Sequence, residues 1–297
     1  MVTQRRELAE MIAAEIQEGM TVYLAGFSHL IPFAAGHEVI RQNIRHLTLC
    51  RATPDLLYDQ MIAAGTADAL VFSYAGNPGV GLLPAFRRAV ESGEIAIEEY
   101  THAEMIARLE AGAAGLPFWP LRAEENDLTR FRGRKSVACP YTGESIPVVP
   151  ALNPDVALLH VQRADEAGNL YVWGLTGDMK EAALAAKRLI ATAEKIVPAD
   201  ALRADRDHLL IPGFRVAAVA EVPFGAHPSY ATGIYERDTA LYQSWTAIAR
   251  DAAGCQTWLD EWVRHVPDHA GYLARWGRDY LAQLTVPEGG LGLAVES

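Results

Sequence analysis

The sequence predicts an α/β protein built on an open, mainly parallel sheet with helices on both faces and further helices at the C-terminal end. Short buried-strand segments alternate with segments of helical periodicity along the first hundred residues, across short connections. The composition is that of a globular protein, because 50% of the 297 residues are hydrophobic and 21% are charged. A chain of this length can bury a sizeable core, and we expect one domain over residues 1–297.

The alternation begins with a helix over 6–17, in which apolar residues recur at helical spacing and after which Gly19 offers a left-handed residue. A short strand follows over 21–25, and helical spacing resumes over 33–42 after Pro32. The same reasoning predicts strands over 47–50, 69–74 and 95–99, and helices over 55–64 and 82–91. Strands that alternate with helices in this way form a parallel sheet.

The middle of the chain starts with a polar, charged stretch over 122–136, which predicts a surface excursion rather than a linker between domains. Buried-strand signals return over 155–162 and 170–173. Gly168-Asn169 supplies turn residues between these two strands.

Asp178 followed by Glu181 predicts a helix start of the capping-box type, ahead of an alanine-rich run. The segment 189–197 suits a strand or a helix, and 214–222 is a clearer strand. After Tyr235 the pattern is helical and rich in aromatic residues, which pack in a core or, less often, build a subunit interface. The tryptophans of this region are Trp245, Trp258, Trp262 and Trp276.

Charge and cysteine usage exclude several classes of protein. The formal net charge is −11 and no run of basic residues occurs, so nucleic acid and anionic membranes are not expected partners. No stretch approaches the ~18 apolar residues of a membrane span, and the first 17 residues lack the apolar core of a signal peptide. Three scattered cysteines favour neither disulfides nor a zinc site. We therefore expect a soluble, cytoplasmic protein.

Gly76-Asn77-Pro78-Gly79-Val80-Gly81 follows a strand and precedes a helix, where backbone amides can meet a phosphate or an oxyanion. Its order is G-x-x-G-x-G, whereas the dinucleotide fingerprint is G-x-G-x-x-G with an acidic residue about twenty positions on. A nicotinamide site is therefore disfavoured, and taken alone the segment reads as a plain turn. The histidines show no H-E-x-x-H pattern, so no metal site is expected.

Ligands of open parallel sheets bind beyond the carboxyl ends of the strands, so the loops after Ala25, Tyr74, Glu99 and Gln162 should line one crevice. His29 lies in the first of these loops. A lone loop histidine is more often a surface residue or a helix cap than a ligand contact.

His102 stands with Glu98, Glu99 and Glu104 after a predicted strand. Carboxylates and an imidazole so close together could transfer protons. The same pattern also suits a strand end followed by a helix N-terminus, where acidic residues are favoured by the helix dipole. Both readings stay open.

His160, Gln162, Arg163 and Asp165 form a second polar group, and four such residues in six positions after a buried run are hard to explain as packing. Asp165 could alternatively form a turn with the backbone of Gly168. The group is a candidate support for a site.

His227 follows a further buried strand, and Pro228 keeps the chain extended there. A rigid loop of this kind can aim a histidine ring at a substrate.

These segments together resemble the α subunit of the family I coenzyme A transferases, most closely the glutaconate CoA-transferase branch. The resemblance runs in order along nearly the whole chain. It is carried by Ala25-Gly26-Phe27, Leu116-Pro117-Phe118, His160 to Asp165 with Gly168-Asn169, Gly225-Ala226-His227-Pro228-Ser229, and Gly233-Ile234-Tyr235.

The resemblance implies a CoA-transferase-like fold, with a strand over 189–197, and an enzyme that moves CoA between carboxylates. In that family a glutamate carboxylate attacks the acyl thioester, gives an anhydride and becomes a glutamyl thioester, which divides one difficult exchange into easier steps. In the two-chain members this glutamate lies on the β subunit, in a motif resembling S-E-N-G. This chain has no Glu-Asn-Gly.

The chain is therefore expected to be the α subunit of a heteromeric acyl-CoA:carboxylate CoA-transferase, whose partner is a β subunit. Coenzyme A would be a substrate, with no permanently bound cofactor, and the second substrate would be a carboxylic acid. The acidic balance of this chain suggests that the partner holds most of the nucleotide phosphates.

Site residues follow from the same resemblance. Stabilisation of charge on the acyl oxygen is expected from the backbone near Gly26 and Phe27, with the loop of Asn77 to Gly79. The expected substrate-binding residues are Ser28, His29, His102, Gln162 and His227.

Two departures from the family stand out. Ala25 replaces the first glycine of the family's Gly-Gly-Phe, which would narrow the pocket, and Pro78 replaces a serine of the glutaconate enzymes.

Two alternatives remain. Relatives in the same superfamily act as hydrolases that open rings of CoA esters, with an acidic α-chain residue whose place falls near His102, beside Glu99 and Glu104. The chain could also be a non-catalytic scaffold subunit.

Overall fold

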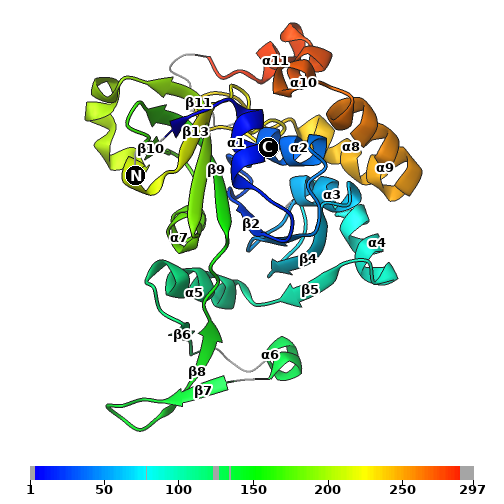
Figure 1. Ribbon diagram of the computed structural model, residues 1–297. Coiled ribbons are helices and arrows are strands. Elements are labelled where there is room, and N and C mark those ends of the chain that lie inside the picture. Colours follow the sequence, from blue (N-terminus) through cyan, green and yellow to red (C-terminus); the bar gives the residue numbers. More distant parts are fainter. Residues whose placement is uncertain (1–3, 78, 123–126, 134, 288–297) are drawn as a thin grey trace.

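The computed structural model describes residues 4–77, 79–122, 127–133 and 135–287. Its body is a ten-stranded sheet, in which eight strands follow the order β1-β13-β11-β9-β2-β3-β4-β5 and pair in parallel (Figure 1). These strands are β1 Gln4–Arg5, β2 Thr21–Leu24, β3 Leu47–Cys50, β4 Ala67–Phe72, β5 Ala96–Glu99, β9 Val156–Asp165, β11 Arg188–Val197 and β13 Ala218–Glu221. The remaining two, β10 (Leu170–Tyr171) and β12 (Leu209–Ile211), pair antiparallel at the end of β9. The predicted open, mainly parallel sheet is confirmed.

Helices cover both faces of this sheet, because neighbouring residues of a strand point to opposite sides. Val22 and Leu24 pack with α1, α2, α3, α8 and α9, whereas Tyr23 and Ala25 pack with α5 and α7. The α-helices are α1 Leu8–Glu15, α2 Phe33–Arg41, α3 Leu56–Ala63, α4 Pro84–Ser92, α5 His102–Ala113, α6 Asp127–Arg132, α7 Met179–Ala185, α8 Thr239–Arg250, α9 Ala252–Leu259, α10 His269–Trp276 and α11 Arg278–Leu284. Short helices of other types are η1 Ala199–His208, η2 Gly213–Arg215 and η3 Asp260–Arg264.

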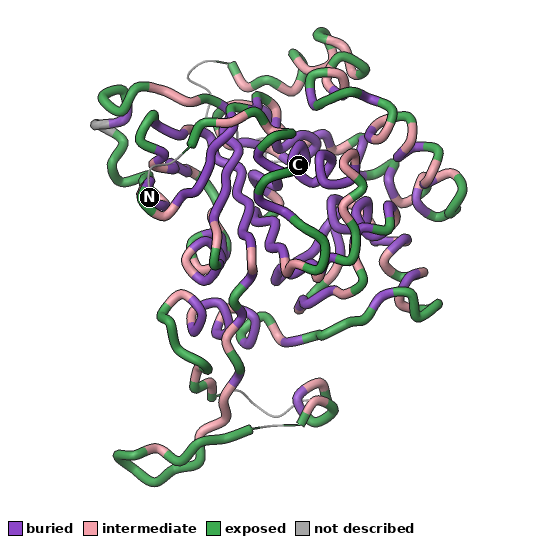
Figure 2. Tube along the Cα trace, in the orientation of Figure 1, coloured by how far each residue is buried: buried purple, intermediate pink, exposed green. Residues whose placement is uncertain are grey.

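A small antiparallel sheet in the order β6-β8-β7 projects from the body below α5 (Figure 1). Its strands are β6 Phe118–Pro120, β7 Lys135–Ala138 and β8 Ser145–Pro150. The polar stretch 122–136 lies within this projection, partly outside the described residues. Figure 2 shows that exposed residues dominate here, whereas the central strands of the body, such as β9 and β11, are largely buried. This sheet was not predicted from the sequence.

Two local predictions are wrong. Asp178 precedes α7 but makes no capping bond, because its carboxylate accepts instead from the hydroxyl of Tyr23. The capping box of the chain lies at α5, where Thr101 and Glu104 satisfy each other's backbone amides. Residues 214–217 precede the strand rather than begin it, because Arg215 turns back to donate to carbonyl groups at the end of α7.

The C-terminal aromatic residues pack against the body and one another. Trp245 is fully buried, and its indole N–H donates to Asp59 of α3 at 2.8 Å. Trp258 meets Trp245 edge to face, while Trp262 stacks on Trp258. Among the described residues, no helix is long and apolar enough to cross a bilayer.

Candidate functional site

The loop after β2 makes a tight turn that requires glycine at position 26. Gly26 has a φ of +103°, and a Cβ there would lie 2.7 Å from the carbonyl oxygen of His29 and 2.8 Å from that of Leu30. Ser28 and Leu30 also have positive φ values, of 54° and 53°. The amide of Phe27 donates back to the His29 carbonyl at 3.2 Å, whereas the Phe27 side chain is 37% exposed. The loop is thus a fixed structure that presents Phe27 outward.

Ala25 does not narrow the crevice as expected. Its methyl group has no exposed surface and packs in the core beneath the loop.

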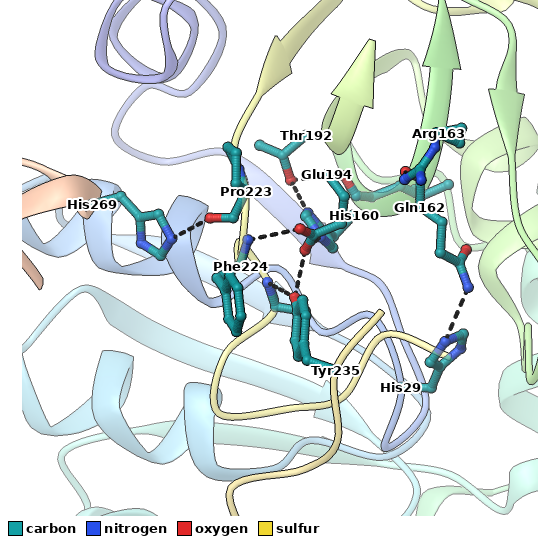
Figure 3. Close-up of polar contacts among 12 residues, drawn as sticks. His29, His160, Gln162, Arg163, Thr192, Glu194, Pro223, Phe224, Tyr235 and His269 are labelled. Atoms are coloured by element: carbon teal, nitrogen blue, oxygen red, sulfur yellow. Dashed lines mark hydrogen bonds and ion pairs between the residues drawn. The ribbon is translucent and has the colours of Figure 1, made fainter. Parts of the chain in front are cut away.

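His29 ties this loop to two others instead of facing solvent. Its Nδ1 lies 2.8 Å from the carbonyl oxygen of Leu175, and its Nε2 accepts from the amide of Thr232 at 3.0 Å. Burial lowers the pKa of His29 to about 4, so the ring is neutral with its proton on Nδ1. Figure 3 shows Gln162 reaching the same ring, with 3.4 Å between its Nε2 and the Nε2 of His29. Both side chains lie behind the loop as braces.

The glycine segment after β4 is a turn that also caps α3. The amides of Val80 and Gly81 both donate to the carbonyl oxygen of Asn77, and the side-chain Oδ1 of Asn77 accepts from the amide of Leu56 at 2.8 Å. Asn77 is only 3% exposed, and its Nδ2 has no partner among the described residues. Gly79 is exposed, and Pro78 lies outside the described residues.

A small pocket brings these two strand ends together with a third segment. It has an empty volume of ≈ 220 Å³, open mouth included. Ser28 and Asn77, which were predicted from different strand ends, both line it. Sequence reasoning missed Arg237, which lies just before α8 and carries no local signal of a site. The lining residues are Ser28, Asp55, Asn77, Val80, Arg237 and Tyr242.

His102 lies at the start of α5, away from this pocket. Its Nε2 is 3.1 Å from the hydroxyl oxygen of Thr53, and the ring is exposed. Two of the three carboxylates predicted around it have other partners, because Glu104 caps the helix and pairs with Arg132 at 2.7 Å. Glu98 pairs with Arg108 at 3.3 Å, and Glu99 is exposed. The helix N-terminus therefore accounts for Glu104, and Glu98 and Glu104 both serve as ion-pair partners of arginines.

His160 of β9 belongs to a buried network centred on Glu194 of β11 (Figure 3). The Glu194 carboxylate lies 2.7 Å from Nε2 of His160 and accepts from the hydroxyl of Tyr235 at 2.5 Å and from the amide of Phe224 at 2.7 Å. A Cβ at Gly225 would lie 2.6 Å from Cε1 of His160, so only glycine allows this approach. The network joins two strands to the loop after β13.

Asp165, at the end of β9, forms a turn with the backbone that follows it, which was the alternative prediction for this residue. Its Oδ1 accepts from the amides of Ala167 and Asn169, both at 2.9 Å. Arg163 lies with its guanidinium 5.9 Å from the ring of Trp173.

His227 is fully buried among the C-terminal helices and lies away from the pocket surface. Its Nδ1 is 2.8 Å from the hydroxyl of Tyr272, and its Nε2 is 3.1 Å from Oδ2 of Asp238. Asp238 in turn caps α8 by accepting from the amide of Leu241 at 2.9 Å. The ring therefore contacts the residue next to Arg237.

The same loop also supports the other side of the pocket. Ser229 donates its hydroxyl to the carbonyl oxygen of Ser28 at 3.0 Å, and the amide of Asp238 donates to the carbonyl oxygen of Pro228 at 3.0 Å. Residues 225–229 thus hold both the Ser28 loop and the Arg237 segment in place. Across the described ranges, no group of three or more His, Cys, Asp or Glu residues could hold a metal ion.

Comparisons with known proteins agree with this architecture. The coenzyme A transferase family matches residues 5–222. The chain is 47% identical over 273 residues to the A subunit of 3-oxoadipate CoA-transferase from Pseudomonas knackmussii, and the match covers 90% of this chain and 96% of the relative. It is 30% identical over 260 residues to the cholesterol ring-cleaving hydrolase IpdA subunit of Rhodococcus jostii, and that match covers 82% and 87%.

The fold also matches a solved structure, that of glutaconate coenzyme A-transferase from Acidaminococcus fermentans. The TM-score is 0.91 at 30% identity, and the match covers 98% of each chain. The chain therefore belongs to the coenzyme A transferase family.

Proposed function

We propose that this chain is the α subunit of a heteromeric acyl-CoA:carboxylate CoA-transferase whose β subunit carries the catalytic glutamate. The observation that carries the proposal is the 47% identity to the A subunit of a 3-oxoadipate CoA-transferase over nearly the full length of both chains. The lack of a Glu-Asn-Gly motif in this chain supports a partner that supplies the nucleophile. CoA enters as a substrate and no other cofactor is needed.

The reaction is a double displacement. The glutamate carboxylate of the partner attacks the carbonyl carbon of the acyl thioester, and the CoA thiolate leaves to give a mixed anhydride. The thiolate then attacks the glutamyl carbonyl, which releases the first acid and leaves CoA on the glutamate. The acceptor acid takes CoA by the same two steps in reverse.

The α chain contributes a preorganised wall to this site. The fixed loop of Gly26, Phe27 and Ser28, with the exposed backbone at Gly79, would face the acyl oxygen as it gains negative charge. The bond from the Phe27 amide to His29 lies at the long end of the normal range, so this amide can share its hydrogen with a second acceptor. Asn77 holds the Gly79 turn through its bond to Leu56.

Three predicted substrate contacts take different roles in this proposal. His29 and Gln162 keep the Phe27 loop in place from behind, and His227 positions the segment that carries Arg237. His102 is exposed at the start of α5 and remains available for a direct substrate contact.

The acid that is exchanged is proposed to be dicarboxylic. 3-Oxoadipate and glutaconate, the acids in the names of two relatives, both carry two carboxylates. The two relatives share 47% and 31% identity with this chain.

The test is co-expression of this chain with the β subunit from the adjacent reading frame, followed by mass spectrometry of acyl-CoA mixed with free carboxylic acids. New acyl-CoA species that require both chains would support transfer. Free CoA with a hydrolysed or ring-opened acid, and no exchanged thioester, would overturn it in favour of the hydrolase.

The hydrolase reading has a weaker basis in this chain. It requires an acidic residue near His102, where Glu104 is bound to Arg132 and to its own helix N-terminus. If the chain were a scaffold subunit, substitution of pocket residues would leave its fold and the activity of the complex unchanged. Loss of partner-dependent activity on substitution of the crevice loops, in a complex that keeps its thermal stability, would exclude that role.

A further inference from the structure

The pocket beneath the Ser28 loop contains a positive charge that its neighbours do not neutralise. The guanidinium of Arg237 donates through Nε to the hydroxyl of Thr239 at 3.3 Å and lies 5.7 Å from the ring centroid of Tyr242. Both partners are uncharged. The acidic residue of the lining, Asp55, is already paired with Arg51 at 3.0 Å, and both side chains are buried. Within the described part of the chain, no carboxylate forms an ion pair with Arg237.

A second donor in the same lining lacks a partner. The bond from Leu56 to Oδ1 of Asn77 fixes the orientation of this amide and leaves Nδ2 as its donor. Nδ2 is buried and makes no hydrogen bond with any described residue. Buried donors are nearly always satisfied, so an unsatisfied one in a pocket wall indicates a ligand or water that belongs there.

The backbone that carries Arg237 is held in place. The adjacent Asp238 caps α8 and accepts from the hydroxyl of Tyr280 at 2.9 Å, while Nε2 of His227 lies 3.1 Å away. The planar guanidinium can then bind a carboxylate through two parallel hydrogen bonds.

We propose that Arg237, together with Nδ2 of Asn77, binds the carboxylate of a dicarboxylic acyl group that does not react. This inference rests on the proposed function and names the residues that recognise its substrate class. The pocket is small, with apolar walls from Val80 and Tyr242. The partner supplies the glutamate that meets the reacting carboxylate, so a cation of this chain suits the carboxylate at the other end of the molecule.

The test compares adipate with hexanoate, which have equal chain lengths and differ by one carboxylate, as CoA acceptors of the αβ complex. With Arg237→Gln, kcat/KM for adipate should fall by about 10- to 150-fold, the value of a hydrogen bond to a charged group. The value for hexanoate should stay within about threefold, and Arg237→Lys should recover part of the loss because it keeps the charge. Equal losses for both acids, or no loss for adipate, would overturn the inference.

A binding measurement separates this inference from the transferase proposal. Calorimetric titration of adipate into the αβ complex should show binding that Arg237→Gln weakens by about 10- to 150-fold, whereas hexanoate should bind much more weakly than adipate. If no acid accepts CoA and adipate binding still depends on Arg237, the transferase proposal fails and the carboxylate site stands. If transfer occurs and adipate binding does not depend on Arg237, the carboxylate site fails and the transferase proposal stands.

A matched control variant tests whether the Arg237 substitution acts by unfolding the protein. Arg87→Gln removes an arginine of α4 whose side chain is 59% exposed, outside the pocket, and should change neither acid's kinetics. Thermal unfolding of the Arg237→Gln complex should match that of the Arg87→Gln complex.

Discussion

Nε2 of His227 lies 3.1 Å from Oδ2 of Asp238, and this buried contact joins the loop after β13 to the start of α8, next to Arg237. The contact explains why a histidine with no exposed surface occurs in the most distinctive motif of the chain. His227 affects the pocket indirectly, by holding the backbone next to Arg237 in place.

His227→Ala should therefore impair acid binding and stability together. Removal of the ring leaves Asp238 and Tyr272 without their shared partner in a buried space, which should lower the free energy of unfolding by about 2–4 kcal/mol. The KM for the acceptor acid should rise more than kcat falls, because Arg237 loses its support. Urea unfolding and steady-state kinetics of the αβ complex check both effects.

His227→Gln is the informative partner variant, because a glutamine amide can still donate to Asp238. It should recover part of both losses. A large fall in kcat with unchanged KM and unchanged stability would instead mean that the ring itself meets the substrate.

Gly26→Ala should disrupt the tight loop after β2. The new Cβ would lie within 2.9 Å of three backbone atoms at a φ of +103°, so the loop must move. Strain and overpacking together should cost about 3 kcal/mol or more of unfolding free energy and most of the activity. Gly19→Ala is the matched control, since its φ is +81° but nothing lies within 4 Å of the added atom. It should cost about 1 kcal/mol, and equal losses in the two variants would show that the loop yields freely.

Much of the main sheet could be predicted from sequence because many of its strands are short apolar runs that alternate with helical segments along the chain. Leu47–Cys50 matches its predicted range, and Asp55 caps α3 where that helix was expected to begin. The start of β13 was predicted too early because Arg215 is held by carbonyl groups of α7, about thirty residues away. Such a contact leaves no local pattern.

The small projecting sheet was missed for a related reason. Its strands are largely exposed, and Pro147 and Pro150 interrupt β8, so neither apolar alternation nor strand propensity marks them. Residues such as Tyr141, which is 94% exposed, carry no sign of a core.

The candidate site, like the fold, could be predicted from the sequence only in part. The rule that ligands bind beyond strand ends indicated the loops of Ser28 and Asn77, the family resemblance singled out the two residues, and the structure places both in one pocket. Sequence could indicate that His29 and His227 are not ordinary packing residues. It could not show whether they bind a substrate or brace a loop, because their partners, Leu175 and Asp238 among them, are defined only by the fold.

Glu194→Gln should destabilise the junction between β11 and the loop after β13. Both carboxylate oxygens are engaged, by Tyr235 and His160 on one side and by the Phe224 amide on the other, so a new NH₂ group would face a donor in either orientation. The expected loss is about 2–4 kcal/mol of unfolding free energy. Glu91→Gln, on an exposed side chain, should change stability by less than about 0.5 kcal/mol. Equal urea midpoints for the two variants would contradict a structural role for the network.

His29 should make stability depend on pH below neutrality. Burial lowers its pKa to about 4 in the folded chain, against an ordinary value of 6.5. Between these values the unfolded chain binds more protons than the folded chain, so stability falls as the pH drops from 6.5 toward 4. For a single group with this shift, the loss of unfolding free energy between pH 7 and pH 5 is about 2 kcal/mol.

His29→Gln removes this titration, so unfolding free energy should fall by about 2 kcal/mol less between pH 7 and pH 5 than in the unsubstituted protein. The variant is also less stable at pH 7, because the contacts to Leu175 and Thr232 are lost. Urea unfolding of both proteins at pH 7 and pH 5 gives the difference directly. Parallel losses in the two proteins would mean that His29 takes up its proton as readily in the folded chain as in the unfolded one, and that it does not brace the loop as a neutral ring.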